Sequence, residues 1–241
     1  MRDARLNARL CSAASLVRQG AVFADIGTDH AYLPIFLLTE GVIDRAYATD
    51  INQGPLSSAR ANVAEAELCD RVTFMLCDGA HALSGKGIDD YAICGMGGEL
   101  IADIIDRAPH LRDGAVRLIL QPMSRQEHLR RYLMSEGFAI RCESYSYDSG
   151  KYYVTLMAEY TGECREIDDR NAWCGIEGAE FLDTDARCGY LCAKLSSLER
   201  ARSGRLAGGS DDNTAPIIDA LRETVSHIRT RLTSHDGEEI I

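Results

Sequence analysis

The chain has 241 residues, of which 46% are hydrophobic, and a formal net charge of -11. A chain of this length buries about 70–75% of the surface that its unfolded form exposes, which predicts one core with an appendage. The acidic balance argues against a uniformly basic surface for nucleic acid, so any RNA site must be a local patch. No apolar run approaches the roughly 18 residues of a membrane span and the start lacks the apolar core of a signal peptide, so we expect a cytoplasmic protein.

The nine cysteines stand at irregular spacing, which predicts reduced thiols rather than a disulfide framework. No CxxC pair occurs in the sequence. Cys188 and Cys192 lie four residues apart, and we favour a buried or half-buried pair over a metal site there. We therefore expect no metal.

An amphipathic helix is predicted over residues 3–18, where apolar side chains recur at helical spacing with arginines on the opposite face. Arg2, Arg5 and Arg9 are spaced to share that face. They form either a basic face for RNA or an ordinary solvated surface, and the second interpretation is favoured for the cluster taken alone. The same two interpretations apply to a second cluster at Arg125, Arg130 and Arg131.

The first strand and the loop after it are the first place to look for a ligand. Apolar residues from Ala21 run into Asp25, and Gly27 allows a sharp turn where a Cβ would obstruct a ligand. Pro34 then suits the first turn of a helix. In open α/β sheets, ligands bind in the crevice beyond the carboxyl ends of the strands.

Two further acids follow predicted strands. Residues 45–50 end in Asp50, about 25 positions beyond Asp25, which is the distance at which an acid usually meets ribose hydroxyls in a βαβ unit. After a helix over residues 54–66, a third strand over residues 72–76 leads into Asp78 and Gly79. The pattern predicts three acids along one edge of a sheet.

The next segment is rich in glycine. A fourth strand over residues 91–94 is followed by three glycines in the four residues Gly95-Met96-Gly97-Gly98, and such a run marks a backbone that passes very close to something. A helix over residues 99–106 comes next. We expect a fifth strand over residues 116–121 that Pro122 stops, and then a helix over residues 124–136 that Gly137 caps.

The βα alternation ends in a predicted hairpin. Residues 138–147 and 152–160 are β-rich runs around Asp148-Ser149-Gly150-Lys151. Two antiparallel helices are predicted over residues 184–206 and 216–232, joined by a flexible polar turn over residues 208–213, and residues 236–241 are expected to fray. This organisation divides the chain into a catalytic domain over residues 1–162 and a helical pair over residues 163–241.

Three segments together resemble the TrmK family of bacterial tRNA (adenine-N1) methyltransferases. They are the first loop from Asp25 to Pro34, the run from Cys94 to Gly98, and the strand from Leu118 to Pro122. The resemblance implies a Rossmann-like class I methyltransferase sheet, mostly parallel with a final antiparallel hairpin, and a small coiled-coil-like helical domain at the C-terminus. It further implies S-adenosylmethionine as cofactor, tRNA as partner and methylation of N1 of the adenine at position 22. The oligomeric state stays open, with a monomer favoured.

The resemblance and the strand-end pattern together assign candidate residues. The cofactor would contact Asp25, Gly27, Asp50, Ile51, Asp78, Gly79, Gly95, Met96 and Gly97. The tRNA would contact Arg5, Arg9, Tyr32, Gly98, Gln121 and Pro122. Asp50 would hold the ribose hydroxyls and Asp78 the adenine amine of the cofactor, although a turn aspartate is the alternative for Asp50.

Asp29 and His30 are the candidate catalytic residues. Asp29 stands where most methyltransferases have a second glycine, and its carboxylate could accept a hydrogen bond from the exocyclic amine of adenine. The alternative is a cap on the following helix. His30 could stack on the target base or assist a proton, but a packed, loop-supporting histidine is equally plausible. The Asn/Asp-Pro-Pro-aromatic clamp of amine-methylating enzymes is absent, which disfavours methylation of an amine.

Three other functions share parts of this pattern. A nicotinamide dehydrogenase would share the fold and the ribose acid, but the GxGxxG fingerprint is missing after the first strand. A small-molecule methyltransferase fits the acidic composition better than a tRNA enzyme does. A non-catalytic tRNA-binding protein with a vestigial cofactor pocket is the third alternative.

Overall fold

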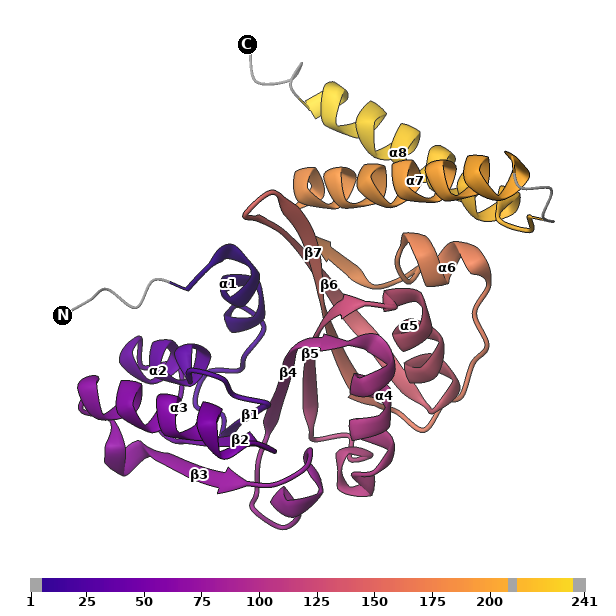
Figure 1. Cartoon of the computed structure of the whole chain (residues 1–241). Coiled ribbons are helices and arrows are strands. Elements are labelled where there is room, and N and C mark those ends of the chain that lie inside the picture. Colours follow the sequence, from indigo (N-terminus) through magenta and orange to yellow (C-terminus); the bar gives the residue numbers. More distant parts are fainter. Residues whose placement is uncertain (1–5, 208–211, 236–241) are drawn as a thin grey trace.

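One eight-stranded sheet organises the protein, in the order β3-β2-β1-β4-β5-β7-β6-β8. The computed structural model describes residues 6–207 and 212–235 (Figure 1). The strands are β1 (Phe23–Ile26), β2 (Ala46–Asp50), β3 (Val72–Leu76), β4 (Asp90–Gly97), β5 (Arg117–Ser124), β6 (Phe138–Asp148), β7 (Lys151–Tyr160) and β8 (Glu180–Leu182). Arg2 and Arg5, the turn residues Gly208–Asp211 and the tail from Asp236 lie outside the described residues.

The strand directions confirm the predicted fold class. β3, β2, β1, β4 and β5 are parallel to one another, and β7 is antiparallel to both β5 and β6. The five parallel strands therefore end at one edge of the sheet, which is where an α/β sheet binds ligands. β8 pairs parallel to β6 at the far side and was not predicted.

Helices cover both faces of the sheet. They are α1 (Ala8–Ala14), α2 (Tyr32–Thr39), α3 (Gln53–Glu65), α4 (Gly98–Asp106), α5 (Gln126–Ser135), α6 (Asp169–Cys174), α7 (Thr184–Ala207) and α8 (Ala215–His235), with 3-10 turns at Cys69–Arg71, His81–Leu83 and Pro109–Leu111. Figure 1 shows α1, α2 and α3 on one side of the sheet, α4 and α5 on the other, and α7 beside α8 beyond the β6–β7 hairpin. Among the described residues, no helix is both long and apolar enough to cross a membrane.

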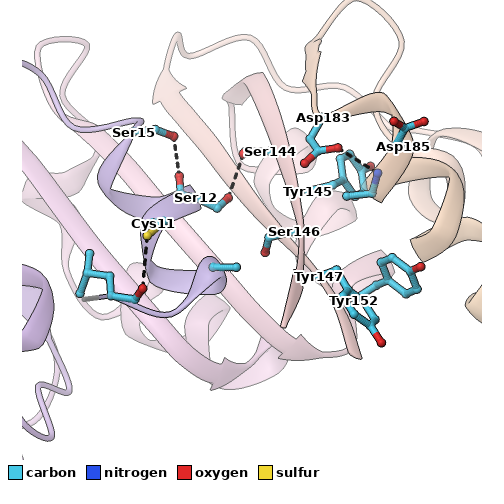
Figure 2. Close-up of a pocket in the computed structure, with 13 residues that line it drawn as sticks. Cys11, Ser12, Ser15, Ser144, Tyr145, Ser146, Tyr147, Tyr152, Asp183 and Asp185 are labelled. Carbon is cyan, nitrogen blue, oxygen red and sulfur yellow. Dashed lines mark hydrogen bonds between the residues drawn. The ribbon is translucent and has the colours of Figure 1, made fainter. Parts of the chain in front are cut away.

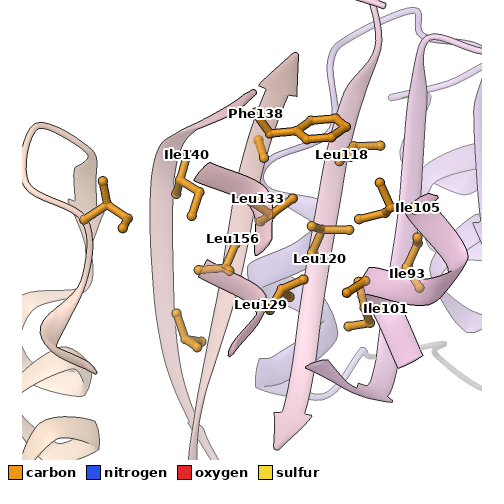
Figure 3. Packing of buried hydrophobic residues seen from close by; sticks show 14 of the residues in the cluster. Ile93, Ile101, Ile105, Leu118, Leu120, Leu129, Leu133, Phe138, Ile140 and Leu156 are labelled. Carbon is orange, nitrogen blue, oxygen red and sulfur yellow. The ribbon is translucent and has the colours of Figure 1, made fainter. Parts of the chain in front are cut away.

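Side chains alternate between the two faces of the parallel strands, and they form one apolar core on each face. Phe23 packs with α1, α2 and α3, whereas its neighbour Ala24 joins the core beneath α4 and α5, because successive side chains of a strand point to opposite faces. Figure 3 shows part of the second core, where Ile101 and Ile105 of α4 and Leu129 of α5 lie against Leu120 of β5. The sheet is thus covered on both sides, as parallel sheets require.

Pro122 does not stop the fifth strand, contrary to expectation. β5 continues to Ser124, and Pro122 is paired with Met96 at a register shift between β4 and β5. On the other side of β5, pairing with β7 ends at Leu120. A proline is tolerated at such a bulge because its missing N–H is not needed for a regular ladder.

The hairpin between β6 and β7 confirms the turn prediction. Ser149 and Gly150 both have positive φ, at 48° and 82°, and Asp148 pairs with Lys151 across the turn. Two-residue turns of this kind match the twist of antiparallel strands. The hairpin extends past the end of β5 and carries its tip toward α7 (Figure 1).

Arg130 is buried, which corrects its placement in a surface cluster. Its guanidinium donates to both carboxylate oxygens of Glu143, at 3.0 and 2.7 Å, and to the carbonyl of Ala172 in α6. Glu143 also accepts from the hydroxyl of Tyr145 and the backbone N–H of Ile176. Burial raises the pKa of Glu143, but the charge and hydrogen bonds of Arg130 outweigh burial and hold the pKa below its ordinary value.

This ion pair ties the segment after β7 to the sheet. Cys174, Ile176 and Leu191 share one apolar core with β4, β5 and β6. The two C-terminal helices are confirmed, but α6 and β8 were missed because their short charged segment has no apolar periodicity. The division at residue 162 stays a prediction.

We predict that Arg130→Met lowers the free energy of unfolding by about 3–5 kcal/mol, because it leaves the Glu143 carboxylate buried without a counter-charge. The neighbouring Arg131, 41% exposed at its side chain and paired with Asp169, provides the control: Arg131→Met should cost less than about 1 kcal/mol. Urea unfolding measures both. Equal losses for the two variants would contradict a stabilising role for the buried pair.

Candidate functional site

The carboxyl edge of the parallel strands gathers both acids and exposed apolar side chains. Asp25 lies in β1, Asp50 ends β2 and Asp78 follows β3. Large hydrophobic residues stand exposed at the same strand ends, although burial stabilises such side chains elsewhere in the fold. They are Tyr32, Ile51, Leu76, Leu100 and Met123. The edge therefore presents a mixed polar and apolar surface of the kind that small-molecule sites use.

The loop after β1 is held closely by the sheet. Gly27 has φ 74°, and a Cβ there would overlap the terminal methyl group of Met96. The N–H groups of Gly27 and Thr28 both donate to the carbonyl of Thr49, each at 2.8 Å. Gly27 is thus needed for its backbone conformation, whereas the flexible end of Met96 could move aside for a side chain.

Asp29 does not cap the helix that follows it. The N-cap of α2 is Ala31, at φ 55°, and no side chain caps this helix. The Asp29 carboxylate is 73% exposed and lies 3.4 Å from Nε2 of His30. The His30 ring stacks on the ring of Tyr32, with centroids 5.1 Å apart and planes at 22°. These three side chains therefore stand together at the rim of the site.

The backbone of His30 is also anchored. Its carbonyl accepts a hydrogen bond from the side chain of Asn62 in α3, at 2.9 Å. The loop-supporting alternative for His30 thus holds for its main chain, while its ring faces Tyr32. Asn62 had no motif around it that could have identified it from the sequence.

Asp25 is a buried carboxylate whose ionised form is disfavoured. It is only 8% exposed, and burial raises its pKa to about 6; the Thr28 hydroxyl opposes this rise and the Asp50 carboxylate adds to it. Asp50 is half-buried, and its Oδ1 accepts the N–H of Asn52 at 2.7 Å. Asp50 is therefore a turn aspartate, as one interpretation had it, and its second oxygen is available to a ligand.

Asp78 has a partner that the sequence did not indicate. Arg107, at the end of α4, donates to Asp78 Oδ2 at 2.5 Å and to Oδ1 at 3.4 Å. Gly79 follows with φ 71°, against the side chain of Ile104. The carboxylate is held in place from outside the loop, and no local signal around Arg107 could have revealed this.

The prediction that the fourth strand ends at residue 94 was wrong, because β4 continues through register shifts to Gly97; Gly98, which begins α4, approaches other backbone as expected. A Cβ on Gly98 would overlap the carbonyl oxygen of Arg125, so the connection between β5 and α5 is the segment that passes closest. Gly95 has φ 79° and donates its N–H to Oε1 of Gln121 at 3.0 Å. Gly97 lies near the hydroxyl of Ser124. Gly98 is buried, and its packing against Arg125 accounts for the glycine without a tRNA contact. Its assignment to tRNA binding stays a prediction.

Arg9 points into the site rather than along a solvated helix face. Its Nη1 donates to Oε1 of Gln121 at 2.6 Å, the same oxygen that accepts from Gly95. Burial, followed by the nearby Asp25 carboxylate, raises the pKa of the Cys94 thiol to about 12, and Arg9 opposes that rise. The Cys94 thiol therefore lies near both the Asp25 carboxylate and the Arg9 guanidinium.

Two predicted tRNA contacts are buried in the structure. Gln121 is fully buried and also donates to the carbonyl of Pro122, which is itself buried. Both residues support the position of Arg9 and the β4 loop, and their assignment to tRNA binding stays a prediction. Within the described part of the chain, no group of three or more His, Cys, Asp or Glu side chains could hold a metal ion.

Comparisons with known proteins agree with this geometry. Residues 6–156 match the family model of a methyltransferase domain. The chain is 32% identical over 203 residues to tRNA (adenine(22)-N(1))-methyltransferase of Bacillus subtilis (strain 168), covering 84% of this chain and 85% of that protein.

Solved structures show the same likeness over nearly the full length. Streptococcus pneumoniae Sp1610 in complex with S-adenosyl-L-methionine has a TM-score of 0.78 and 31% identity, covering 92% of this chain and 100% of that chain. TrmK of M. capricolum in complex with S-adenosyl-homocysteine has a TM-score of 0.70 and 26% identity, covering 95% of this chain and 98% of that chain.

The buried Asp25 carboxylate should make the free energy of unfolding depend on pH. Because the pKa of Asp25 is raised from 3.8 to about 6 in the folded protein, the ionised group destabilises the fold fully above pH 6, and this cost is lost as the pH falls from 6 to about 3.8. Asp25→Asn should therefore raise the free energy of unfolding at pH 8 by about 2–3 kcal/mol, with little gain near pH 4. Urea unfolding at both pH values measures the difference. An Asn variant less stable than the native protein at pH 8 would contradict the assignment.

Proposed function

The chain belongs to the family of tRNA (adenine(22)-N(1))-methyltransferases, and from this premise we propose that it transfers the methyl group of S-adenosylmethionine to N1 of the adenine at position 22 of tRNA. The observation that carries the proposal is the set of acids and exposed apolar residues at the strand ends. A tRNA substrate agrees with the cytoplasmic location expected from the sequence. That location and the oligomeric state remain predictions.

The strand-end residues fit the adenosine part of the cofactor. The oxygen of Asp50 that does not bond Asn52 would accept from the ribose hydroxyls, and Asp78, which Arg107 holds, would accept from the exocyclic amine. Ile51 and Leu76 are 62% and 57% exposed beside these acids, and they offer the apolar surfaces that a purine ring needs. Gly27 keeps the first loop free of a side chain.

Asp25 and Arg9 fit the two charges of an amino acid. Asp25 is a buried carboxylate suited to a cation, and Arg9 is a guanidinium whose recorded bond goes to a neutral amide oxygen. We therefore propose that Arg9 faces the carboxylate of the methionine part of the cofactor. This revises its expected place on a tRNA-binding face.

The chemical step makes modest demands on the side chains. When bound, S-adenosylmethionine supplies a methyl group on a positively charged sulfur. Adenine N1 has a free lone pair at neutral pH, so orientation and exclusion of water can supply most of the rate. Asp29 would accept from the exocyclic amine of the target adenine, and the stacked His30 and Tyr32 rings offer a flat surface for the base.

Methyl transfer from labelled cofactor to a tRNA transcript tests the proposal directly. We expect N1-methyladenosine in the digested product, and no transfer to a transcript with guanine at position 22. The acidic net charge of -11 favours a small-molecule substrate as the second candidate. Cofactor binding without transfer to tRNA would favour that candidate or a non-catalytic tRNA-binding protein, and binding of a nicotinamide cofactor would favour a dehydrogenase.

We predict that Asp29→Ala lowers turnover about ten- to a hundredfold, because it removes a charge-assisted hydrogen bond of about 1.5–3 kcal/mol to the base. Cofactor affinity should change little, and Asn should restore part of the rate. Because Asp29 caps no helix, the melting temperature should stay near that of the native protein. A fully active Ala variant would end the catalytic assignment.

A different readout separates the two roles of Arg9. If Arg9 binds the cofactor carboxylate, Arg9→Gln should weaken cofactor binding in calorimetry by about tenfold or more, since a charge-assisted hydrogen bond is lost. The salt dependence of tRNA binding should not change, because that slope counts phosphate contacts. If the variant keeps its cofactor affinity but its tRNA affinity depends less steeply on salt, Arg9 binds the tRNA backbone instead.

A further inference from the structure

A hollow lies between α1, the tip of the β6–β7 hairpin and the start of α7. We call it the hairpin groove. It is open to solvent, has a volume of about 840 Å³, and is lined by residues that include Ser12 of α1, Ser15 just after α1, Ser146 and Tyr147 of β6, Tyr152 of β7, and Asp185 of α7. Figure 2 shows these side chains around the groove. None of them has a role in the cofactor site.

An exposed aromatic pair stands at one end of the hairpin groove. Tyr147 and Tyr152 are cross-strand partners, and their ring centroids are 4.7 Å apart. They are 55% and 36% exposed. The ring of Tyr152 lies against Gly189 of α7, where any Cβ would overlap it. The ring planes are tilted by 49°, so the more exposed Tyr147 ring is the one whose face is open for stacking, and Tyr152 supports it from α7.

The polar groups of the hairpin groove select the chemistry of its ligand. The hydroxyl of Ser146 is buried and has no hydrogen-bond partner within residues 6–207 and 212–235. Asp183 also lines the hollow, and its carboxylate is used to cap α7 by accepting the N–H of Ala186 at 2.9 Å. Two carboxylates in one groove repel a phosphate, whereas they can accept from the amino group of a base.

The hairpin groove opens next to the candidate site. Arg9, which bonds Gln121 in the site, and Ser12, which bonds Ser144 at the groove, are three residues apart on α1. They are therefore neighbours on one helix surface. The ring of Tyr153 lies 6.0 Å from the Arg9 guanidinium on the α1 side of the hairpin, whereas Tyr147 and Tyr152 point to the opposite face, because successive side chains of a strand alternate. The lining of the groove includes residues of both faces, so a ligand in it would pass around the edge of β6 between the tyrosine pair and α1.

We propose that the hairpin groove holds an unpaired nucleotide that flanks the methylated adenine in the tRNA. Its base stacks on the more exposed Tyr147 ring, with Tyr152 beside it, and an exocyclic amine of that base donates to Asp185. The inference rests on the proposed function, since it takes tRNA as the substrate. Enzymes that act on extruded bases often contact the flanking nucleotides as well.

The decisive variant is Tyr147→Ala, because Tyr152 also packs on α7 and its loss could disturb the fold. We expect the KM for tRNA to rise about 5- to 100-fold, as for loss of one stacked base, with cofactor affinity and saturated turnover near native values. Tyr147→Phe should behave like the native enzyme. The control is Leu206→Ala, which removes another exposed side chain about 30 Å along α7 from Asp185.

A double-mutant cycle, with one change in the protein and one in the tRNA, tests the contact between Asp185 and the base. Asp185→Ala should raise KM for native tRNA, but should have no effect on a transcript with uridine at the contacted flanking position, since uracil has no exocyclic amine. If Tyr147→Ala and Leu206→Ala give the same KM, or if Tyr147→Phe loses as much as Tyr147→Ala, stacking in the groove is wrong. Native enzyme that transfers no methyl group to tRNA would instead overturn the proposed function.

Discussion

A carboxylate buried where the parallel strands end is the constraint on which the site depends. Asp25 is 8% exposed with its pKa raised to about 6, so the fold carries a destabilising ionised group at neutral pH. Its surroundings suit a ligand with a cationic group: Gly27 puts no side chain in the loop, and the Arg9 guanidinium at Gln121 provides a positive charge for an anionic group. Strain and unfavourable charge of this kind are common at binding sites, where the ligand offsets them.

The N-terminal helix connects this site to the rest of the molecule. Arg9 reaches Gln121, and through that oxygen it shares a partner with the Gly95 loop. One turn later, Ser12 bonds Ser144 in β6, beside the hairpin groove. A single short helix therefore positions a charge at the cofactor pocket and a wall of the groove, so both surfaces are fixed by one element packed on the sheet.

The sequence predicted features with strong local signals. The parallel strands, the Ser149–Gly150 hairpin turn and the close approach at the glycine run each depend on residues near in the chain. Contacts between distant segments were missed: Arg130 looked like a surface cation because Glu143 lies on another element, and Arg9 looked solvated because Gln121 is 112 residues away. β8 and α6 are short and are held by tertiary packing, which propensity does not report.

The most direct test of this account is the number of protons released when S-adenosylmethionine binds, obtained by calorimetry at pH 6 in two buffers with different ionisation enthalpies. A cation bound beside Asp25 stabilises the ionised carboxylate, so its pKa of about 6 should fall on binding and a fraction of a proton should be released. The account predicts release at pH 6, almost none at pH 8, and none with Asp25→Asn. Tight binding with no release at pH 6, or equal release from the Asn variant, would contradict it.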